Sequence, residues 1–212
     1  PHDLDGDNVY KVSVQASAGT DITSMDISIS IQDALEGRVV DGPIIGAFVF
    51  IDNDGDLVFD EEEYKTTTDS EGFFFLNKAT ISCTGECNQR LVARSGIDSH
   101  TGRSSSLILM APVVLDKLVT ISPISTLLTV ASDNRALLDG LSITDDHDDV
   151  LTSKFWSLAL QDNLAAKEMV KVNFQLSMIL NAIHNLIPPQ NNLTNMQIAA
   201  AAATKLAYII SN

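Results

Sequence analysis

The stretch Ile121-Ser122-Pro123-Ile124-Ser125-Thr126-Leu127 marks the place where the sequence changes from a strand-like to a helix-like pattern. Serine before proline is a helix-start signal, because the serine hydroxyl caps the helix and proline at the first helical position gives up no needed N–H. We therefore expect a short helix over residues 123–131. Strands before this point and helices after it predict an α+β fold, with an N-terminal antiparallel β-sandwich followed by a bundle of about four helices.

Three further helices are expected after the first one. The clearest covers residues 163–187, where apolar side chains recur every three or four residues along one face. Pro188-Pro189 ends this helix, because proline cannot continue the hydrogen-bond pattern. The other two helices are expected at about residues 149–160 and 195–210.

The segment before residue 121 has the pattern of β-strands separated by turns. In residues 25–31 apolar and polar side chains alternate, which is typical of a half-buried strand. Strands are expected at residues 9–17, 23–32, 37–40, 46–51, 72–76, 90–94 and 107–111. The predicted organisation is a strand segment at residues 1–33, a β-sandwich at 34–120 and a helical subdomain at 121–212.

Charge is distributed unevenly along the 212 residues, whose formal net charge is −15. Residues 1–72 hold 17 acidic and 3 basic side chains, whereas residues 73–212 hold 11 and 10. This balance argues against a nucleic-acid partner and against docking on an anionic membrane, which both need basic surfaces. The longest apolar stretch, residues 196–210, is interrupted by Lys205, so no membrane insertion is expected. Carboxylates packed this densely repel one another unless cations neutralise them.

Residues 52–63, the acidic loop, have acidic side chains at the spacing of calcium ligands. The predicted ligands are Asp52, Asp54, Asp56, Asp60 and Glu63 at positions 1, 3, 5, 9 and 12, with the Val58 carbonyl at position 7. Calcium takes six to eight oxygen ligands, and this spacing wraps one chain around one ion. Two features differ from an EF-hand: the sixth position is Leu57 instead of glycine, and a strand instead of a helix precedes the loop. The alternative is an exposed acidic hairpin without an ion.

A shorter acidic pattern lies at the start of the chain. It comprises Asp3, Asp5 and Asp7, with Gly6 between the last two. No acidic residue follows at the ninth or twelfth position, so this pattern predicts at most half of a calcium site, which a preceding domain would complete.

Cys83 and Cys87 are the two cysteines of the chain and are separated by three residues. Zinc would need two more ligands, and the sequence offers no second cysteine pair and no His-x₃₋₅-His. A redox pair normally has two intervening residues. We therefore expect a disulfide that closes a small loop, formed in an oxidising, extracellular compartment.

Motifs of nucleophilic hydrolases, P-loop proteins, zinc proteases and dinucleotide-binding proteins are absent from the sequence. The acidic side chains cluster as cation ligands and not as a catalytic pair. The chain is therefore expected not to be an enzyme.

Three stretches together resemble giant bacterial RTX-type surface adhesins. The segment from Asp3 to Asp33 is similar to the closing strands of their cadherin-like or Ig-like repeats. Residues 37–47, continued through the acidic loop to Phe73, resemble a prealbumin-like β-module of the same proteins. Residues 96–102, 109–112 and 121–127 resemble the segment that leads into their helical half.

The resemblance implies a ligand-binding module that recognises peptides, favouring a free C-terminal carboxylate, with calcium taking part. Partners would be a peptide or protein C-terminus on a target cell surface and the adjacent domains of a longer adhesin, as in cell adhesion and biofilms. The candidate rim of the ligand site is residues 96–103, where Asp98 would hold the ion and Thr101 and Arg103 would meet the ligand carboxylate. An ordinary turn is the alternative for this loop. The alternative for the whole chain is a calcium-rigidified spacer domain with no ligand of its own.

Overall fold

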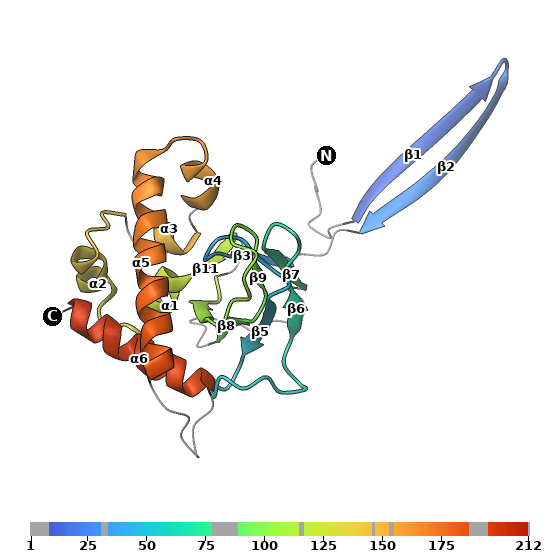
Figure 1. The fold of residues 1–212 in the computed structure, drawn as a ribbon. Helices are drawn as coiled ribbons and strands as arrows, with labels where there is room; N and C mark the ends of the chain where they lie inside the picture. Colours follow the sequence, from blue (N-terminus) through green and yellow to red (C-terminus); the bar gives the residue numbers. More distant parts are fainter. Residues whose placement is uncertain are drawn as a thin grey trace. The chain divides into compact units, whose positions relative to one another are not determined.

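The computed structural model describes residues 9–30, 34–77, 89–114, 117–145, 147–152, 155–186 and 195–211. The chain divides into two compact units: Pro1–Ala34 with Asn77–Ser82, and Leu35–Leu76 with Cys83–Asn212. The α+β class expected from the sequence is confirmed, because strands make up the earlier part of the second unit and helices make up the rest (Figure 1).

Most of the described residues of the first unit form a two-stranded hairpin. It pairs β1 (Val9–Ala18) with β2 (Asp21–Ser30) in antiparallel register, so that Val9 lies opposite Ser30. The two strands meet at a tight turn in which Gly19 has a φ of +66°. Glycine adopts this left-handed conformation without strain, and two-residue hairpin turns require it.

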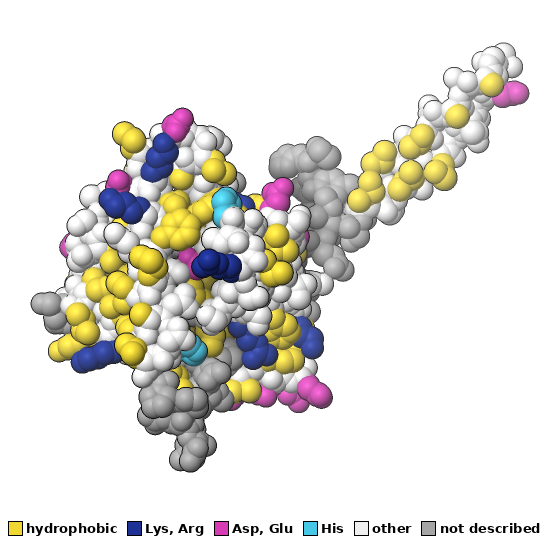
Figure 2. Space-filling view, in the orientation of Figure 1, with side chains coloured by type: hydrophobic (Ala, Val, Ile, Leu, Met, Phe, Trp, Pro, Cys, Tyr) yellow, Lys and Arg dark blue, Asp and Glu magenta, His cyan; other side chains and the backbone are white. Residues whose placement is uncertain are grey.

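One face of this hairpin is apolar. Val12 lies opposite Ile27 and Val14 lies opposite Met25, so the alternation places apolar side chains on one face, but the half-burial that it predicted is not observed. All four side chains are exposed, and hydrophobic side chains follow one another along the hairpin in Figure 2. An isolated two-stranded hairpin is at best marginally stable in water, so this face lacks the packing that normally supports a sheet.

The second unit contains a four-stranded antiparallel sheet with the order β10–β8–β5–β6. Its strands are β5 (Phe48–Asp52), β6 (Lys65–Thr67), β8 (Arg90–Arg94) and β10 (Ile108–Pro112). The inner strands β5 and β8 are almost wholly buried, which explains why their sequences are apolar runs and not alternating ones.

A three-stranded sheet with the order β11–β3–β7 corrects the expectation of antiparallel pairing throughout. It comprises β3 (Ala34–Val39), β7 (Phe73–Asn77) and β11 (Val119–Ile121), and β11 pairs with β3 in parallel. A parallel pair needs a long crossover connection, and most of the β-region lies between these two strands. Two short strands, β4 (Ile44–Ile45) and β9 (Ile97–Asp98), form a separate antiparallel pair.

Six helices occur in the described residues, where the sequence predicted about four. They are α1 (Pro123–Val130), α2 (Asn134–Gly140), α3 (His147–Thr152), α4 (Phe155–Ala159), α5 (Leu164–Leu186) and α6 (Asn195–Ser211). The helix expected at residues 149–160 corresponds to two short helices, and α2 was not predicted. Its start signal is Asp133, whose side chain accepts a hydrogen bond from the Ala136 N–H.

The predicted start of the first helix is confirmed. Ser122 is the N-cap of α1, and its hydroxyl accepts a hydrogen bond from the Ser125 N–H. The Ser125 hydroxyl donates to the carbonyl of Met110 in β10, and the Thr126 hydroxyl accepts from the Met110 N–H. The polar side chains at the helix start therefore fix α1 to the four-stranded sheet.

Asn173 of the long helix α5 makes a second buried polar connection. Its side-chain oxygen accepts a hydrogen bond from the Ile124 N–H at the start of α1, at 3.3 Å. Its side-chain nitrogen donates to the Val40 carbonyl just after β3, also at 3.3 Å. One amide thereby joins α5, α1 and the three-stranded sheet.

Candidate functional site

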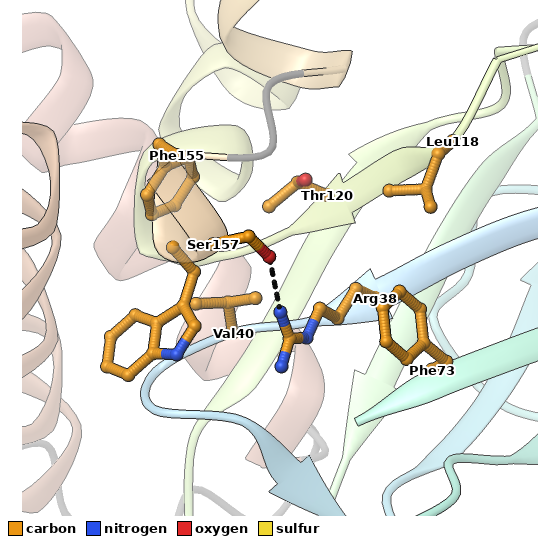
Figure 3. Close-up of a pocket in the computed structure, with 8 residues that line it drawn as sticks. Arg38, Val40, Phe73, Leu118, Thr120, Phe155 and Ser157 are labelled. Atoms are coloured by element: carbon orange, nitrogen blue, oxygen red, sulfur yellow. Dashed lines mark hydrogen bonds between the residues drawn. The ribbon is translucent and has the colours of Figure 1, made fainter. Parts of the chain in front are cut away.

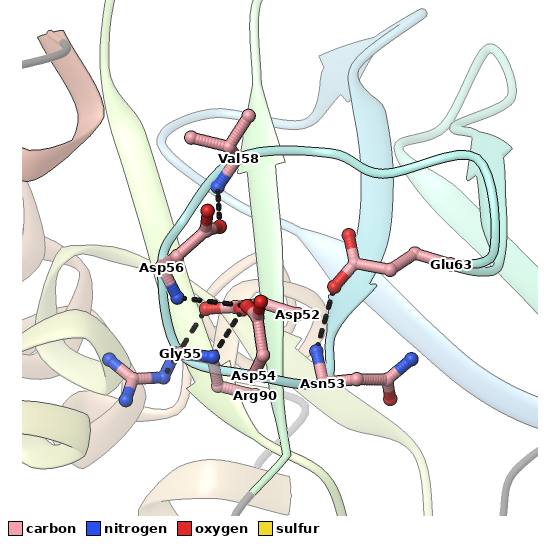
Figure 4. Close-up of polar contacts among 8 residues, drawn as sticks. All are labelled: Asp52, Asn53, Asp54, Gly55, Asp56, Val58, Glu63 and Arg90. Atoms are coloured by element: carbon pink, nitrogen blue, oxygen red, sulfur yellow. Dashed lines mark hydrogen bonds and ion pairs between the residues drawn. The ribbon is translucent and has the colours of Figure 1, made fainter.

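The acidic loop begins inside the protein, at the end of β5. Asp52 is only 1% exposed, because β5 lies between two neighbouring strands in the core. Glu63, at the far end of the loop, is also buried. Its Oε1 accepts a hydrogen bond from the Asn53 N–H at 2.8 Å, and its Oε2 accepts from the Asp60 N–H at 3.2 Å. Glu63 therefore closes the loop onto its own first residues (Figure 4).

The first half of the loop is shaped by carboxylates that accept hydrogen bonds from the backbone. Asp52 Oδ1 accepts from the Gly55 N–H at 2.8 Å, and Asp54 Oδ1 accepts from the Asp56 N–H at 3.1 Å. Asp56 Oδ1 accepts from the Val58 N–H at 2.6 Å. These bonds hold the carboxylates on the inner side of the turn, where Figure 4 shows them gathered.

Leu57 explains one departure from the EF-hand pattern. Its φ is +64°, so the sixth position adopts the left-handed conformation for which EF-hands use glycine. Its side chain is 4% exposed and belongs to the core cluster of Phe50, Val92 and Met110. The leucine thus anchors the loop in the core at the cost of a strained backbone conformation.

The predicted calcium ligands are brought together in two overlapping groups. Oxygen atoms of Asp52, Asp54 and Glu63 lie within 4.8 Å of one another, and so do those of Asp54, Asp56 and Asp60. Val58 contributes its N–H to this network. The two groups share Asp54, so the loop brings its five acidic side chains into two adjoining clusters, and a calcium ion bound there stays a prediction.

Asp52 provides a further indication that an ion fits this loop. Among the described residues, its buried Oδ2 has no hydrogen-bond partner, and the Nε of Arg90 lies 3.6 Å from it. That distance is an ion pair without a hydrogen bond. A buried carboxylate oxygen normally has a partner, and a hard divalent cation would supply one.

The electrostatics of the buried carboxylates also favour a cation. Burial raises the pKa of Asp52, and the nearby charge of Asp54 adds to this effect. Burial likewise raises the pKa of Glu63, with smaller contributions from Asp52 and Asp60. A bound divalent cation would favour the charged forms and so offset the free energy that burying them costs.

The second predicted site, residues 96–103, forms a closed turn. Asp98 Oδ1 accepts a hydrogen bond from the His100 N–H at 2.8 Å, and its Oδ2 accepts from the Thr101 hydroxyl at 2.7 Å. The Asp98 N–H donates to the Arg103 carbonyl at 2.9 Å. The carboxylate that was expected to hold an ion is therefore engaged in shaping its own turn, and a role in ligand binding stays a prediction.

Asp3, Asp5, Asp7, Cys83 and Cys87 lie outside the described residues. The half calcium site at the start of the chain and the disulfide therefore stay predictions.

Asp41 is a partly buried residue that the sequence did not single out. Its Oδ2 accepts a hydrogen bond from the Ser177 hydroxyl of α5 at 2.7 Å, whereas its Oδ1 is buried without a partner. Burial raises the pKa of Asp41 to about 6, the Ser177 hydrogen bond opposes this rise, and the charge of Asp98 adds to it. A lone aspartate between a strand and a Gly-Pro turn gives no sequence signal of such burial.

Replacing Asp41 by asparagine is expected to stabilise the protein at neutral pH. Folding raises the pKa of Asp41 from 3.8 to about 6. The folded protein therefore favours the protonated form, so the free energy of unfolding is highest below pH 3.8 and falls as the pH rises through 6. Asparagine cannot ionise, so Asp41→Asn should gain up to about 3 kcal/mol at pH 8 and much less at pH 4. Denaturant unfolding at both pH values measures this, with exposed Asp139→Asn as control. Equal pH dependence in the wild type and Asp41→Asn would contradict it.

No family model, curated protein or solved structure matches this chain. Within the described residues, no helix has both the length and the apolar character needed to cross a membrane.

Proposed function

We propose that this chain is a calcium-binding, non-enzymatic module of a bacterial surface adhesin. The observation that carries the calcium part is the buried Asp52, whose Oδ2 has no hydrogen-bond partner in the described part of the chain and whose oxygens lie close to those of Asp54 and Glu63. The donor set consists of carboxylate oxygens, which suit a hard cation such as calcium and not a thiolate-bound metal. The bound ion would cross-link the two ends of the acidic loop.

The proposed adhesin role is supported by the resemblance of the sequence to RTX-type surface adhesins and by the negative charge of the chain. A protein of net charge −15 repels an anionic ligand, so a cation that keeps one or two coordination positions open would reverse the local sign. A peptide's C-terminal carboxylate could then complete the coordination. The proposed setting is the cell surface, where calcium is available and where the predicted Cys83–Cys87 disulfide would persist.

The hairpin of β1 and β2 supports a place within a longer chain. Its apolar face, with Val12, Val14, Met25 and Ile27, is exposed. We assign these strands to the end of a cadherin-like or Ig-like repeat, whose other strands would cover this face. In the same proposal, the two sheets of the second unit correspond to a prealbumin-like or Ig-like sandwich, and the helices correspond to the helical half of the module.

A spacer function is the second candidate, and one observation favours it. Both Glu63 oxygens and the Oδ1 atoms of Asp52 and Asp54 already accept backbone hydrogen bonds, and Leu57 anchors the loop in the core. Such a site would stiffen the domain by holding the loop closed. A coordination sphere completed by the protein alone would leave no position for a ligand.

Calorimetry with peptides distinguishes the two functions. The titrants are a mixed tripeptide library with free C-termini and the same library with amidated C-termini, each in millimolar calcium and in chelator. The peptide-binding function predicts heat from the free-acid library that calcium strengthens, with modest affinity because the peptide must be ordered on binding. The spacer function predicts no calcium-dependent heat from either library. Equal binding of both libraries, or free-acid binding that calcium leaves unchanged, would contradict the calcium-dependent mechanism.

A further inference from the structure

A cavity of about 220 Å³ lies beside the three-stranded sheet, and the described residues that line it include none from the acidic loop. Side chains of β3, β7, β11 and α4 contribute to its lining. The lining residues are Arg38, Val40, Phe73, Leu118, Thr120, Phe155, Trp156 and Ser157 (Figure 3). Most of these side chains are apolar or aromatic, and Arg38 is the one charged group among them.

Arg38 is held in a fixed position at the wall of this cavity. Its Nε donates a hydrogen bond to the Glu71 carbonyl at 2.9 Å, and its Nη1 donates to the Ser157 hydroxyl at 3.3 Å. The guanidinium lies 4.7 Å from the centre of the Phe73 ring, a favourable cation–π contact. A turn carbonyl, the Phe73 ring of β7 and the Ser157 hydroxyl of α4 therefore orient the side chain before any ligand arrives.

The charge of Arg38 has no ion-pair partner in the described part of the chain. Glu71 binds it only through a backbone carbonyl, and Asp69 Oδ1 accepts hydrogen bonds from the N–H groups of Glu71 and Phe73. Burial lowers the pKa of Arg38, and the charges of Glu71 and Asp69 oppose this effect. An arginine stays protonated at neutral pH, so the cavity contains a positive charge that no carboxylate of the described residues contacts.

We propose that this cavity binds a carboxylate that carries one small apolar group. Among the described residues, the Nη2 of Arg38 has no hydrogen-bond partner and Nη1 uses one of its two N–H groups, so the guanidinium can still donate to a carboxylate. The apolar group would lie among Val40, Phe155 and Trp156. The volume is below the ~300–1,000 Å³ of sites for drug-sized ligands, so the ligand is about the size of one amino-acid residue.

A carboxylate fits this site better than a phosphate. The described lining of the cavity offers one cation, which neutralises the single charge of a carboxylate, whereas a phosphate would bring additional charge into a protein of net charge −15. The ligand chemistry has two sources, the C-terminal residue of a peptide or a free carboxylic acid. The proposal goes beyond the calcium-dependent function, because Arg38 supplies the positive charge without any metal ion.

Trp156 is the only tryptophan of the chain and lines the cavity, so its fluorescence reports occupancy directly. The probes are N-acetyl-leucine as a model of a peptide terminus, 4-methylpentanoate as a free acid, and N-acetyl-leucinamide as the uncharged control. Each is titrated in chelator and in calcium. We expect a saturable change with at least one acid in both conditions, and at least tenfold weaker binding of the amide, as expected for a lost charge-assisted hydrogen bond. The acid that binds more tightly identifies the source.

Arg38→Gln should weaken acid binding by about 10- to 100-fold, because it removes the charge but keeps a polar side chain of similar reach. Arg135→Gln, at an exposed arginine of α2, makes the same charge change outside the cavity and should bind like the wild type. The comparison of acid with amide uses the wild-type protein and does not depend on how well a variant folds. Equal responses to acid and amide, no saturable response, or unchanged binding by folded Arg38→Gln would overturn the proposal. Acid binding only in calcium would also overturn it and would instead support the calcium-dependent mechanism.

Discussion

The melting temperature is expected to rise by about 5–10 °C when calcium is added to a hundredfold excess over its Kd. Binding to the native state alone adds about 2.7 kcal/mol at that excess, and about 1 kcal/mol shifts the melting temperature of a domain of this size by roughly 2–4 °C. The physical reason lies in Asp52 and Glu63, two buried carboxylates whose raised pKa values show that their charged forms are disfavoured without a cation. Differential scanning calorimetry in calcium and in chelator measures the shift.

The acidic loop contains its own matched control for this experiment. Glu63→Gln removes a buried charge that closes the loop, whereas Glu62→Gln makes the same chemical change one residue earlier at an exposed position. We expect Glu63→Gln to lose most of the calcium-induced shift and Glu62→Gln to keep it. Magnesium at the same concentration should stabilise less, because it demands tighter octahedral geometry than a flexible loop provides. A melting curve that calcium leaves unchanged, or equal loss in both variants, would contradict a calcium site centred on Glu63.

The parts of the fold that were predictable from sequence are those with a strong local signal. Ser122-Pro123 defined the start of α1, because capping depends on neighbouring residues only. The alternation around residues 25–31 defined β2, and the spacing of the acidic side chains identified the loop that gathers them. Each of these signals needs no information about distant parts of the chain.

The features that were missed depend on contacts between distant residues. The parallel pairing of β11 with β3 follows from the crossover of the chain, which no local pattern encodes. Arg38 has no local signal as part of a cavity, because its partner Ser157 lies 119 residues further along the chain. The short helix α2 was missed because seven residues hold too few apolar positions to establish a helical period, although Asp133 was available as its cap.

Leu57 links the calcium loop to the core, and its replacement by alanine should cost about 2–5 kcal/mol of folding free energy. The side chain is 4% exposed and packs in the cluster of Phe50, Val92 and Met110, so its removal leaves a cavity beneath the loop. Because the same side chain positions the turn that follows Asp56, Leu57→Ala should also weaken calcium binding. Denaturant unfolding measures the first effect in chelator, and calorimetric calcium titration measures the second.

Leu57→Gly separates packing from backbone strain at this position. Both variants lose the buried side chain, but Leu57 has a φ of +64°, a conformation that costs an alanine roughly 1–2 kcal/mol and a glycine almost nothing. We therefore expect Leu57→Gly to be more stable than Leu57→Ala by about 1 kcal/mol, the reverse of the usual order of these two residues in regular structure. If alanine were the more stable of the two, position 57 would not have the left-handed conformation, and the likeness of this turn to the glycine turn of an EF-hand would be lost.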